Sequence, residues 1–343
     1  QQGGASQSRS SGMVLHLDLD RVVFDKTPWW PEPLRVTRAT GQLKLNYDPL
    51  TLDLGLMQAE VNGADLSLSG HAVLTPLGWS YDGQGRVPSV DTQTLMTLWP
   101  DMLKSKSRRW FRQNVRKGTM KNLTVDLRQT AGTAAVLASS FQFEEAEVKF
   151  MRHMPVISEG LGYGVFERDE FILALETGYV QAAEGGRLHM DGSTMRVPNA
   201  RMPDPIARFD LKGRGAVPTV MSLLDNKPFE IPTKTKRGID DVSGQAELAI
   251  EIETRLKTGI TPREVAYDLT GTLRDLSSEV LVPGRMFTAQ ELQLTGAPDL
   301  LEISGEGRVS DIPFTGIWSQ PLGAENLPSQ VTAKFELSSR SLK

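Results

Sequence analysis

Apolar and polar residues alternate in short stretches that recur from one end of the chain to the other. The clearest stretches are residues 43–47, 52–56, 66–70, 123–127, 248–252, 292–296 and 301–305. Successive side chains of a β-strand point to opposite faces of a sheet, so each stretch predicts a strand with one apolar and one polar face. Turn residues such as Asp48-Pro49 and Asn62-Gly63 separate the strands. We therefore expect a mainly β protein, a long antiparallel meander with one continuous apolar face.

The alternation breaks between Asp91 and Lys117, where apolar residues recur every three to four positions. This spacing predicts two short helices, with Pro100 as an interruption. A second short apolar stretch, residues 217–224, leads through a polar loop to Gly244 and a strand, just as the first leads to Gly118 and a strand. The same order used twice indicates an internal duplication, which favours an elongated array.

These patterns suggest three segments. Residues 1–12 are rich in Gln, Ser and Gly, and we interpret them as a linker or an expression remnant. A first β segment is expected over residues 13–140, with its helical spacer near 91–117. A second is expected over 141–343, continuing the same sheet. The glycine-rich stretch 160–164 predicts a turn between strands.

Composition narrows the chemistry. The chain has 343 residues, 39% of them hydrophobic and 23% charged, which is typical of a folded protein. The net charge of −4 gives no reason to expect nucleic acid as a partner. There is no Cys, which excludes disulfides, a thiol nucleophile and zinc-ribbon sites. No apolar run approaches the ~20 residues of a membrane span.

Candidate catalytic motifs are weak. Asp18 and Asp20 resemble the acidic strand end of haloacid-dehalogenase-type phosphotransferases, but the doubly wound α/β domain that this chemistry needs is not indicated. His16, His71, His153 and His189 lack metal-ligand spacing, and no Gly-x-Ser-x-Gly motif occurs. We expect solvent-facing carboxylates and histidines, no metal, no cofactor and no enzymatic activity.

The order of the motifs resembles a known family. The first match is a helix with a Trp, followed by a Gly turn and an alternating strand, over residues 110–127. The second has the same order and comprises residues 217–225, 242–248 and 267–273. The third comprises residues 141–150 and 155–162. This order is similar to that of the AsmA-like superfamily of bacterial envelope proteins, of the YhdP- and TamB-like type. The resemblance covers nearly the whole chain after Gly12. The chain departs from the full-length pattern in its short length and in lacking the N-terminal transmembrane helix.

The resemblance implies a sheet curled into a U-shaped, apolar-lined trough (β-taco-like) with a few short helices. It also implies a bridge-like lipid carrier in the Gram-negative periplasm, tethered to the inner membrane in a longer protein. We expect such a carrier to shield acyl chains of phospholipids or other envelope lipids between the two membranes. The residues expected to line the groove are Leu43, Leu45, Leu52, Leu54, Leu66, Leu68, Leu123, Val125, Leu248, Ile250, Leu292 and Leu294.

Two other interpretations of the alternating strands remain open. The apolar face can be the core of a closed β-sandwich, which makes the chain a structural or assembly module of the cell envelope. The chain can also act on envelope glycolipid with carboxylates that no motif identifies.

A basic segment surrounds the first helical spacer. Lys104, Arg108, Arg109 and Arg112 accompany Trp110 there, a composition typical of helices that lie on anionic membranes. The alternative is a structural helix whose apolar side packs on the sheet while its basic side chains are solvated.

Overall fold

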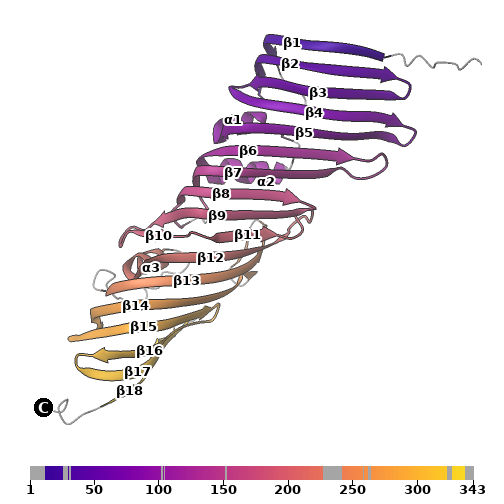
Figure 1. The fold of residues 1–343 in the computed structure, drawn as a ribbon. Helices are drawn as coiled ribbons and strands as arrows, with labels where there is room; N and C mark the ends of the chain where they lie inside the picture. The colour runs from indigo at the N-terminus through magenta and orange to yellow at the C-terminus, as the bar shows by residue number, and fades with distance from the viewer. Residues whose placement is uncertain are drawn as a thin grey trace, which may run out of the picture. The chain divides into compact units, whose positions relative to one another are not determined.

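The computed structural model describes residues 12–25, 30, 32–101, 103, 105–150, 153–226, 242–257, 259–261, 264–322 and 327–336. These described residues form one antiparallel meander of 18 strands with three helices (Figure 1). The mainly β fold class predicted from the alternation is confirmed. The expected linker lies outside the described residues, apart from Gly12, which begins the first strand.

The elements of the first part of the chain are β1 (Gly12–Phe24), β2 (Leu34–Tyr47), β3 (Leu50–Val61), β4 (Ala64–Thr75), β5 (Gly78–Asp91), α1 (Thr92–Leu98), α2 (Ser105–Asn114), β6 (Val115–Gln129) and β7 (Val136–Val148). Those that follow are β8 (Ile157–Glu167), β9 (Glu170–Gln181), β10 (Arg187–His189), β11 (Ser193–Val197), β12 (Ile206–Ala216), α3 (Val217–Leu224), β13 (Val242–Arg255), β14 (Ala266–Val282), β15 (Arg285–Ala297), β16 (Leu300–Val309), β17 (Ile312–Pro321) and β18 (Gln330–Phe335).

The chain divides into two compact units. Unit 1 comprises Gln1–Glu144 and Gly164–Asp169, and unit 2 comprises Glu145–Tyr163 and Glu170–Lys343. The short helices appear at both predicted places, α1 and α2 between β5 and β6, and α3 after β12. The hairpin turn at Asn62-Gly63 is also as predicted, with both residues at positive φ (51° and 83°).

The register of unit 1 aligns apolar side chains in rows that cross the strands. In one row Leu15 pairs with Leu43, and Leu43 with Leu54. A parallel row nearer the helices places Val36 between Val22 and Val61. Residues directly opposite each other in an antiparallel pair point to the same face, so these rows make one apolar face.

Bulges interrupt the alternation without breaking this face. Val36 and Ala39 are both buried although they lie three residues apart, and the register of β2 and β3 shifts between Val36 and Arg38. In unit 2, Leu273 and Leu276 flank a bulge at Asp275, whose φ is 51°. Each bulge adds one residue, and the hydrophobic pattern changes phase with it, so apolar residues stay on one side.

Helices α1 and α2 pack on the apolar face of unit 1 at one end of β5 and β6 (Figure 1). Leu95 of α1 joins a buried cluster with Ala64 and Val90, and Phe111 of α2 packs against it. The N-terminus of α1 is capped by Asp91, whose carboxylate accepts hydrogen bonds from the backbone N–H groups of Gln93 (2.8 Å) and Thr94 (3.0 Å).

The cap makes a pH-dependent contribution to stability. The hydroxyl and backbone of Thr94 hold the pKa of Asp91 below its ordinary value of 3.8. We expect Asp91→Ala to lower the free energy of unfolding by about 1 kcal/mol near neutral pH. Because the folded-state pKa is depressed, this contribution is present above pH 3.8 and is lost as the pH falls through the lower folded-state value. Urea unfolding followed by circular dichroism measures it.

The matched control for this cap is Gln93→Ala, an exposed position in the same turn. We expect it to change stability by less than about 0.5 kcal/mol. A difference between Asp91→Ala and the parent protein that stays constant from neutral to strongly acidic pH would contradict the ionised cap.

Unit 2 contains the larger buried cluster. Its members come from one face of β13–β16 and from α3, and they are Val217, Val220, Val242, Ala246, Leu248, Leu273, Leu276, Ala289, Leu292, Leu294 and Leu301. Helix α3 begins with Pro218 in its first turn and places Val217, Val220 and Leu223 on one buried side. The apolar face of unit 2 is therefore a packed core.

The prediction of a turn at residues 160–164 is wrong. These residues lie inside β8, where Gly160, Gly162 and Gly164 alternate on a buried face. In unit 1, a Cβ on Gly164 would come within 2.8 Å of the Phe141 ring. The close approach of the Phe141 ring therefore requires a glycine at position 164, and this glycine lies in a strand, not in a turn.

Candidate functional site

The apolar face of unit 1 is packed at one end of its strands and open at the other. Near α1, Val90 is only 4% exposed. Along the same face of the neighbouring strand β4, Leu68 is 37% exposed and Leu74 is 40% exposed. Trp79 of β5 lies directly opposite Leu74 and is also exposed. An apolar surface that continues a buried core into solvent is a candidate binding surface.

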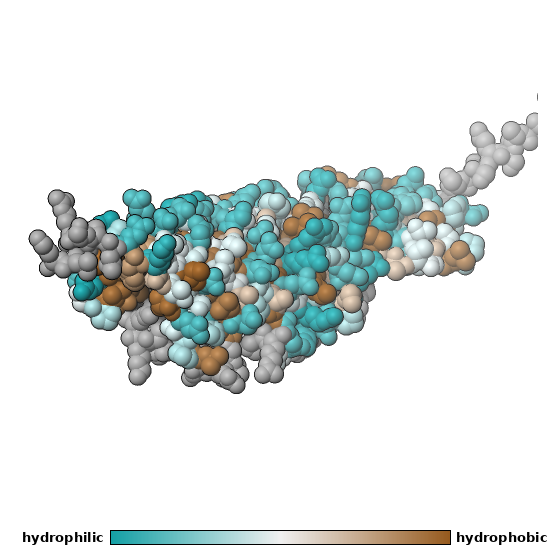
Figure 2. All heavy atoms as spheres, turned by 90° about the horizontal axis from the view of Figure 1, so that it is seen from below, coloured by the Kyte–Doolittle hydropathy of each residue, from teal (hydrophilic) through white to brown (hydrophobic). Residues whose placement is uncertain are grey.

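We call this surface the open apolar face. It comprises partly or fully exposed residues of β1 to β6 that lie on the apolar face, namely Met13, Leu15, Leu43, Leu45, Leu52, Leu54, Leu68, Leu74, Trp79, Val125 and Leu127. Exposed hydrophobic residues are visible among polar ones in the space-filling view (Figure 2).

A strip without side chains runs through the open apolar face. Gly70 and Gly83 lie directly opposite each other on β4 and β5, and Gly83 lies opposite Leu127 on β6. Next to them, Leu68 leans toward Gly85, because a Cβ there would lie 3.3 Å from a Leu68 methyl group. Leu68 and Leu127 therefore each lie beside backbone that carries no side chain.

The groove-lining leucines predicted from the sequence share one face within each unit. In unit 1 the register joins Leu43 to Leu54 and Leu45 to Leu52. In neighbouring rows, Leu68 and Val125 both lie opposite Gly85, and Leu66 and Leu123, two residues away from them, point to the same face. In unit 2, Leu248 and Leu294 both lie opposite Gly271. Within each unit the register therefore groups on one face the residues that the alternation groups, and their contact with lipid stays a prediction.

Exposure divides the predicted lining residues in a way that the sequence did not indicate. Leu248, Leu292 and Leu294 are buried; Leu294, for example, is 7% exposed in the unit 2 cluster. Ile250 is half-buried farther along β13. The open surface is in unit 1, where Met13, Leu74, Trp79 and Leu127 belong to it in addition to the predicted residues. The signal that would have included them is the same alternation, extended along β1, β4, β5 and β6.

The basic segment has two kinds of residue. Arg108 is structural: its side chain is 12% exposed, it pairs with Asp101 (2.6 Å), and it donates hydrogen bonds to the carbonyls of Met96 and Trp99 at the end of α1. Arg109, Trp110 and Arg112 are exposed. Lys104 lies outside the described residues.

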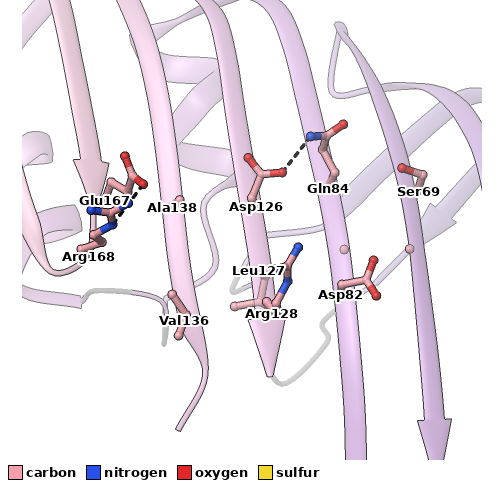
Figure 3. A pocket seen from close by; sticks show the side chains of 12 residues that line it. Ser69, Asp82, Gln84, Asp126, Leu127, Arg128, Val136, Ala138, Glu167 and Arg168 are labelled. Carbon is pink, nitrogen blue, oxygen red and sulfur yellow. Dashed lines mark hydrogen bonds and ion pairs between the residues drawn. The ribbon is translucent and has the colours of Figure 1, made fainter. Parts of the chain in front are cut away.

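A polar depression lies on the opposite face of unit 1 (Figure 3). Its volume is about 720 Å³, and its side chains include Asp82, Asp126, Arg128 and Glu167. Gln84 donates a hydrogen bond to Asp126 (2.7 Å) across neighbouring strands. Both charge signs are present, and the residues come from regular strands, so the depression offers no concentrated charge for a specific ligand.

The candidate catalytic motifs stay dispersed. Asp18 and Asp20 are exposed on β1, which pairs antiparallel with β2, so they do not occupy the end of a parallel strand. His71 pairs with Asp53 on the polar face. Among the described residues, no group of three or more His, Cys, Asp or Glu side chains is arranged to hold a metal ion.

Within the described part of the chain, none of the helices has both the length and the apolar character needed to cross a bilayer. Comparison of the chain with protein-family models, with curated proteins and with solved structures gave no match.

Proposed function

We propose that this protein is a non-catalytic lipid carrier. In this proposal the open apolar face shields acyl chains of phospholipids or other envelope lipids while they move between the inner and outer membranes. The observation that carries the proposal is the exposure of aligned leucines, such as Leu68 and Leu74, on the face that is a buried core elsewhere in the unit.

The dimensions and energetics of the face suit an acyl chain. Six neighbouring strands, β1–β6, contribute to the rows. At ~4.8 Å between strands, a row extends about 24 Å, a length comparable to that of an extended long acyl chain. Each methylene group removed from water contributes ~0.8 kcal/mol, so leucines can hold a chain without a specific polar contact.

The charge distribution supports a carrier of acyl chains over a site for polar ligands. Ion pairs such as Arg38–Glu60 lie on the opposite face, outside the apolar rows. A lipid on the open apolar face would therefore be held mainly by its chains, and weak headgroup recognition allows it to move on. A lipid carrier needs few specific contacts, because very tight binding would prevent release of the lipid.

The proposal includes a relationship to the AsmA-like envelope proteins and a periplasmic location. The supporting observation is an arrangement that occurs twice: a helix is followed by a strand that contains a glycine at positive φ. Gly118 has φ 149° in β6, and Gly244 has φ 136° in β13. A Cβ on Gly244 would lie 2.9 Å from the carbonyl oxygen of Arg274, so only glycine fits.

The test is photo-crosslinking of lipid to the two faces. The photoreactive amino acid p-benzoylphenylalanine is placed at Leu127 on the open apolar face or, as the matched control, at the adjacent Arg128 on the polar face. We expect phospholipid adducts at Leu127 and few at Arg128, measured by lipid mass spectrometry after extraction of the purified protein.

Equal crosslinking at both positions, or no lipid at either, would reject the carrier proposal. The second result would favour a structural module of the envelope, for which the packed cluster of unit 2 is the supporting observation.

A further inference from the structure

The segment around α2 is the most basic part of an acidic chain. No Asp or Glu occurs between Asp101 and Asp126, whereas Lys and Arg recur throughout that interval, and the whole chain has a net charge of −4. Local charge of this kind attracts anions even when the protein as a whole does not.

Helix α2 is anchored through the side that carries Arg108 and Phe111. Phe111 packs on the Val90 and Leu95 cluster, and its ring lies 6.0 Å from that of Trp99. Arg108, one turn earlier, is tied to Asp101 and to the carbonyls of α1. These two residues lie three positions apart and define the inward side of the helix.

The outward side presents Trp110, which is 50% exposed, and its sequence neighbour Arg109, which is exposed as well. Arg112 is also exposed; it lies one turn after Arg108 and therefore on the flank of the helix. Leu103, just before the helix, is another exposed hydrophobic residue. An indole next to arginines is the combination that settles at the headgroup level of a bilayer, where the ring is half in apolar surroundings and the cations meet phosphates.

We propose that the surface formed by Arg109, Trp110 and Arg112 docks on anionic phospholipid headgroups of a membrane. The charge of the arginines complements anionic lipid, and the exposed indole favours a membrane over a nucleic acid or an acidic peptide. The helix packs on the apolar face near the open apolar face, so docking there brings a membrane close to the surface proposed to carry acyl chains. The inference goes beyond the proposed function, because it concerns headgroup charge and not acyl chains.

Vesicle co-flotation tests the inference. We expect the protein to float with vesicles of phosphatidylcholine mixed with phosphatidylglycerol and not with vesicles of phosphatidylcholine alone. Arg109→Glu combined with Arg112→Glu should weaken binding to the anionic vesicles by at least about 30-fold. Trp110→Ser should weaken it by about tenfold, and Trp110→Phe should remove a blue shift of tryptophan fluorescence that the parent protein shows on binding.

The control variant is Arg86→Glu combined with Arg128→Glu. It makes the same charge change at exposed positions on the polar face of β5 and β6, and we expect vesicle binding to stay within about twofold. Leu68→Asp with Leu127→Asp should also leave vesicle binding intact, so failure of the carrier proposal and failure of this one are separable. Unchanged unfolding curves confirm that each variant is folded.

Two outcomes would overturn the inference. One is equal flotation of the parent protein and the Arg109→Glu, Arg112→Glu variant. The other is binding of a single-stranded oligonucleotide that depends on these arginines while anionic vesicles are ignored, which would assign the surface to nucleic acid.

Discussion

Replacing Leu68 and Leu127 together by Asp is expected to lower the affinity for a fluorescent fatty acid by about 100-fold. Two leucine side chains that contact an acyl chain contribute about 3 kcal/mol through burial, and every 1.4 kcal/mol is a factor of about ten. Both residues are already partly exposed and each lies opposite a glycine, so carboxylates there remain solvated and the fold should persist. Titration with cis-parinaric acid measures the change.

The control for this pair introduces the same charge on the polar face. Gln42→Asp with Ser69→Asp places two carboxylates on β2 and β4, pointing away from the open apolar face. We expect affinity within about twofold of the parent protein. If this control loses as much affinity as the leucine pair, the probe is responding to net charge and the assignment of the face is wrong.

Gly185→Ala is expected to destabilise unit 2 by about 3 kcal/mol. Gly185 has φ 78°, and a Cβ there would overlap the backbone of α3, where it would lie 2.7 Å from the carbonyl carbon of Pro218. The backbone of a helix cannot yield as a flexible side chain does, so α3 must shift away from its cluster or lose its hydrogen bond from the Thr219 hydroxyl to the Gly185 carbonyl. Chemical unfolding measures the loss.

The adjacent Gly186 supplies the matched control for this clash. Its φ is 105°, yet a Cβ there would meet nothing within 4 Å. Gly186→Ala is therefore expected to lower the free energy of unfolding only by the conformational strain of a positive φ, about 1 kcal/mol. Equal losses for the two variants would show that strain alone matters and that contact with α3 does not.

Much of the fold could be read from local patterns. Alternation placed Leu43, Leu54 and Leu294 on the apolar face, because every second side chain of a pleated strand points to the same face of the sheet. The change of period between Asp91 and Lys117 predicted the helices for a similar reason. Bulges such as that at Asp275 leave the apolar residues on one face, because the hydrophobic pattern shifts by one residue at the position where the bulge adds a residue to the strand.

Other features were predicted wrongly or were not predicted, because they depend on contacts between residues that are far apart in the sequence. The glycines of residues 160–164 suggested a turn, but they lie in a strand, and Gly164 leaves room for the Phe141 ring of another strand. Arg108 looked like its basic neighbours in the sequence, and only its distance to Asp101 and the end of α1 identifies it as structural. No local rule distinguishes an arginine that braces a helix from one that faces solvent.

The sequence by itself determined the class of the fold, the positions of the helices and the face shared by leucines such as Leu43 and Leu54, because these follow from backbone geometry within a few residues. Only the tertiary structure decided which part of that face is a core and which part is a surface. Leu294 and Leu68 have the same alternating surroundings in sequence, yet the first is buried in a cluster with α3 and the second is more than one-third exposed. Burial depends on what packs over a side chain, and those contacts come from residues far apart along the chain.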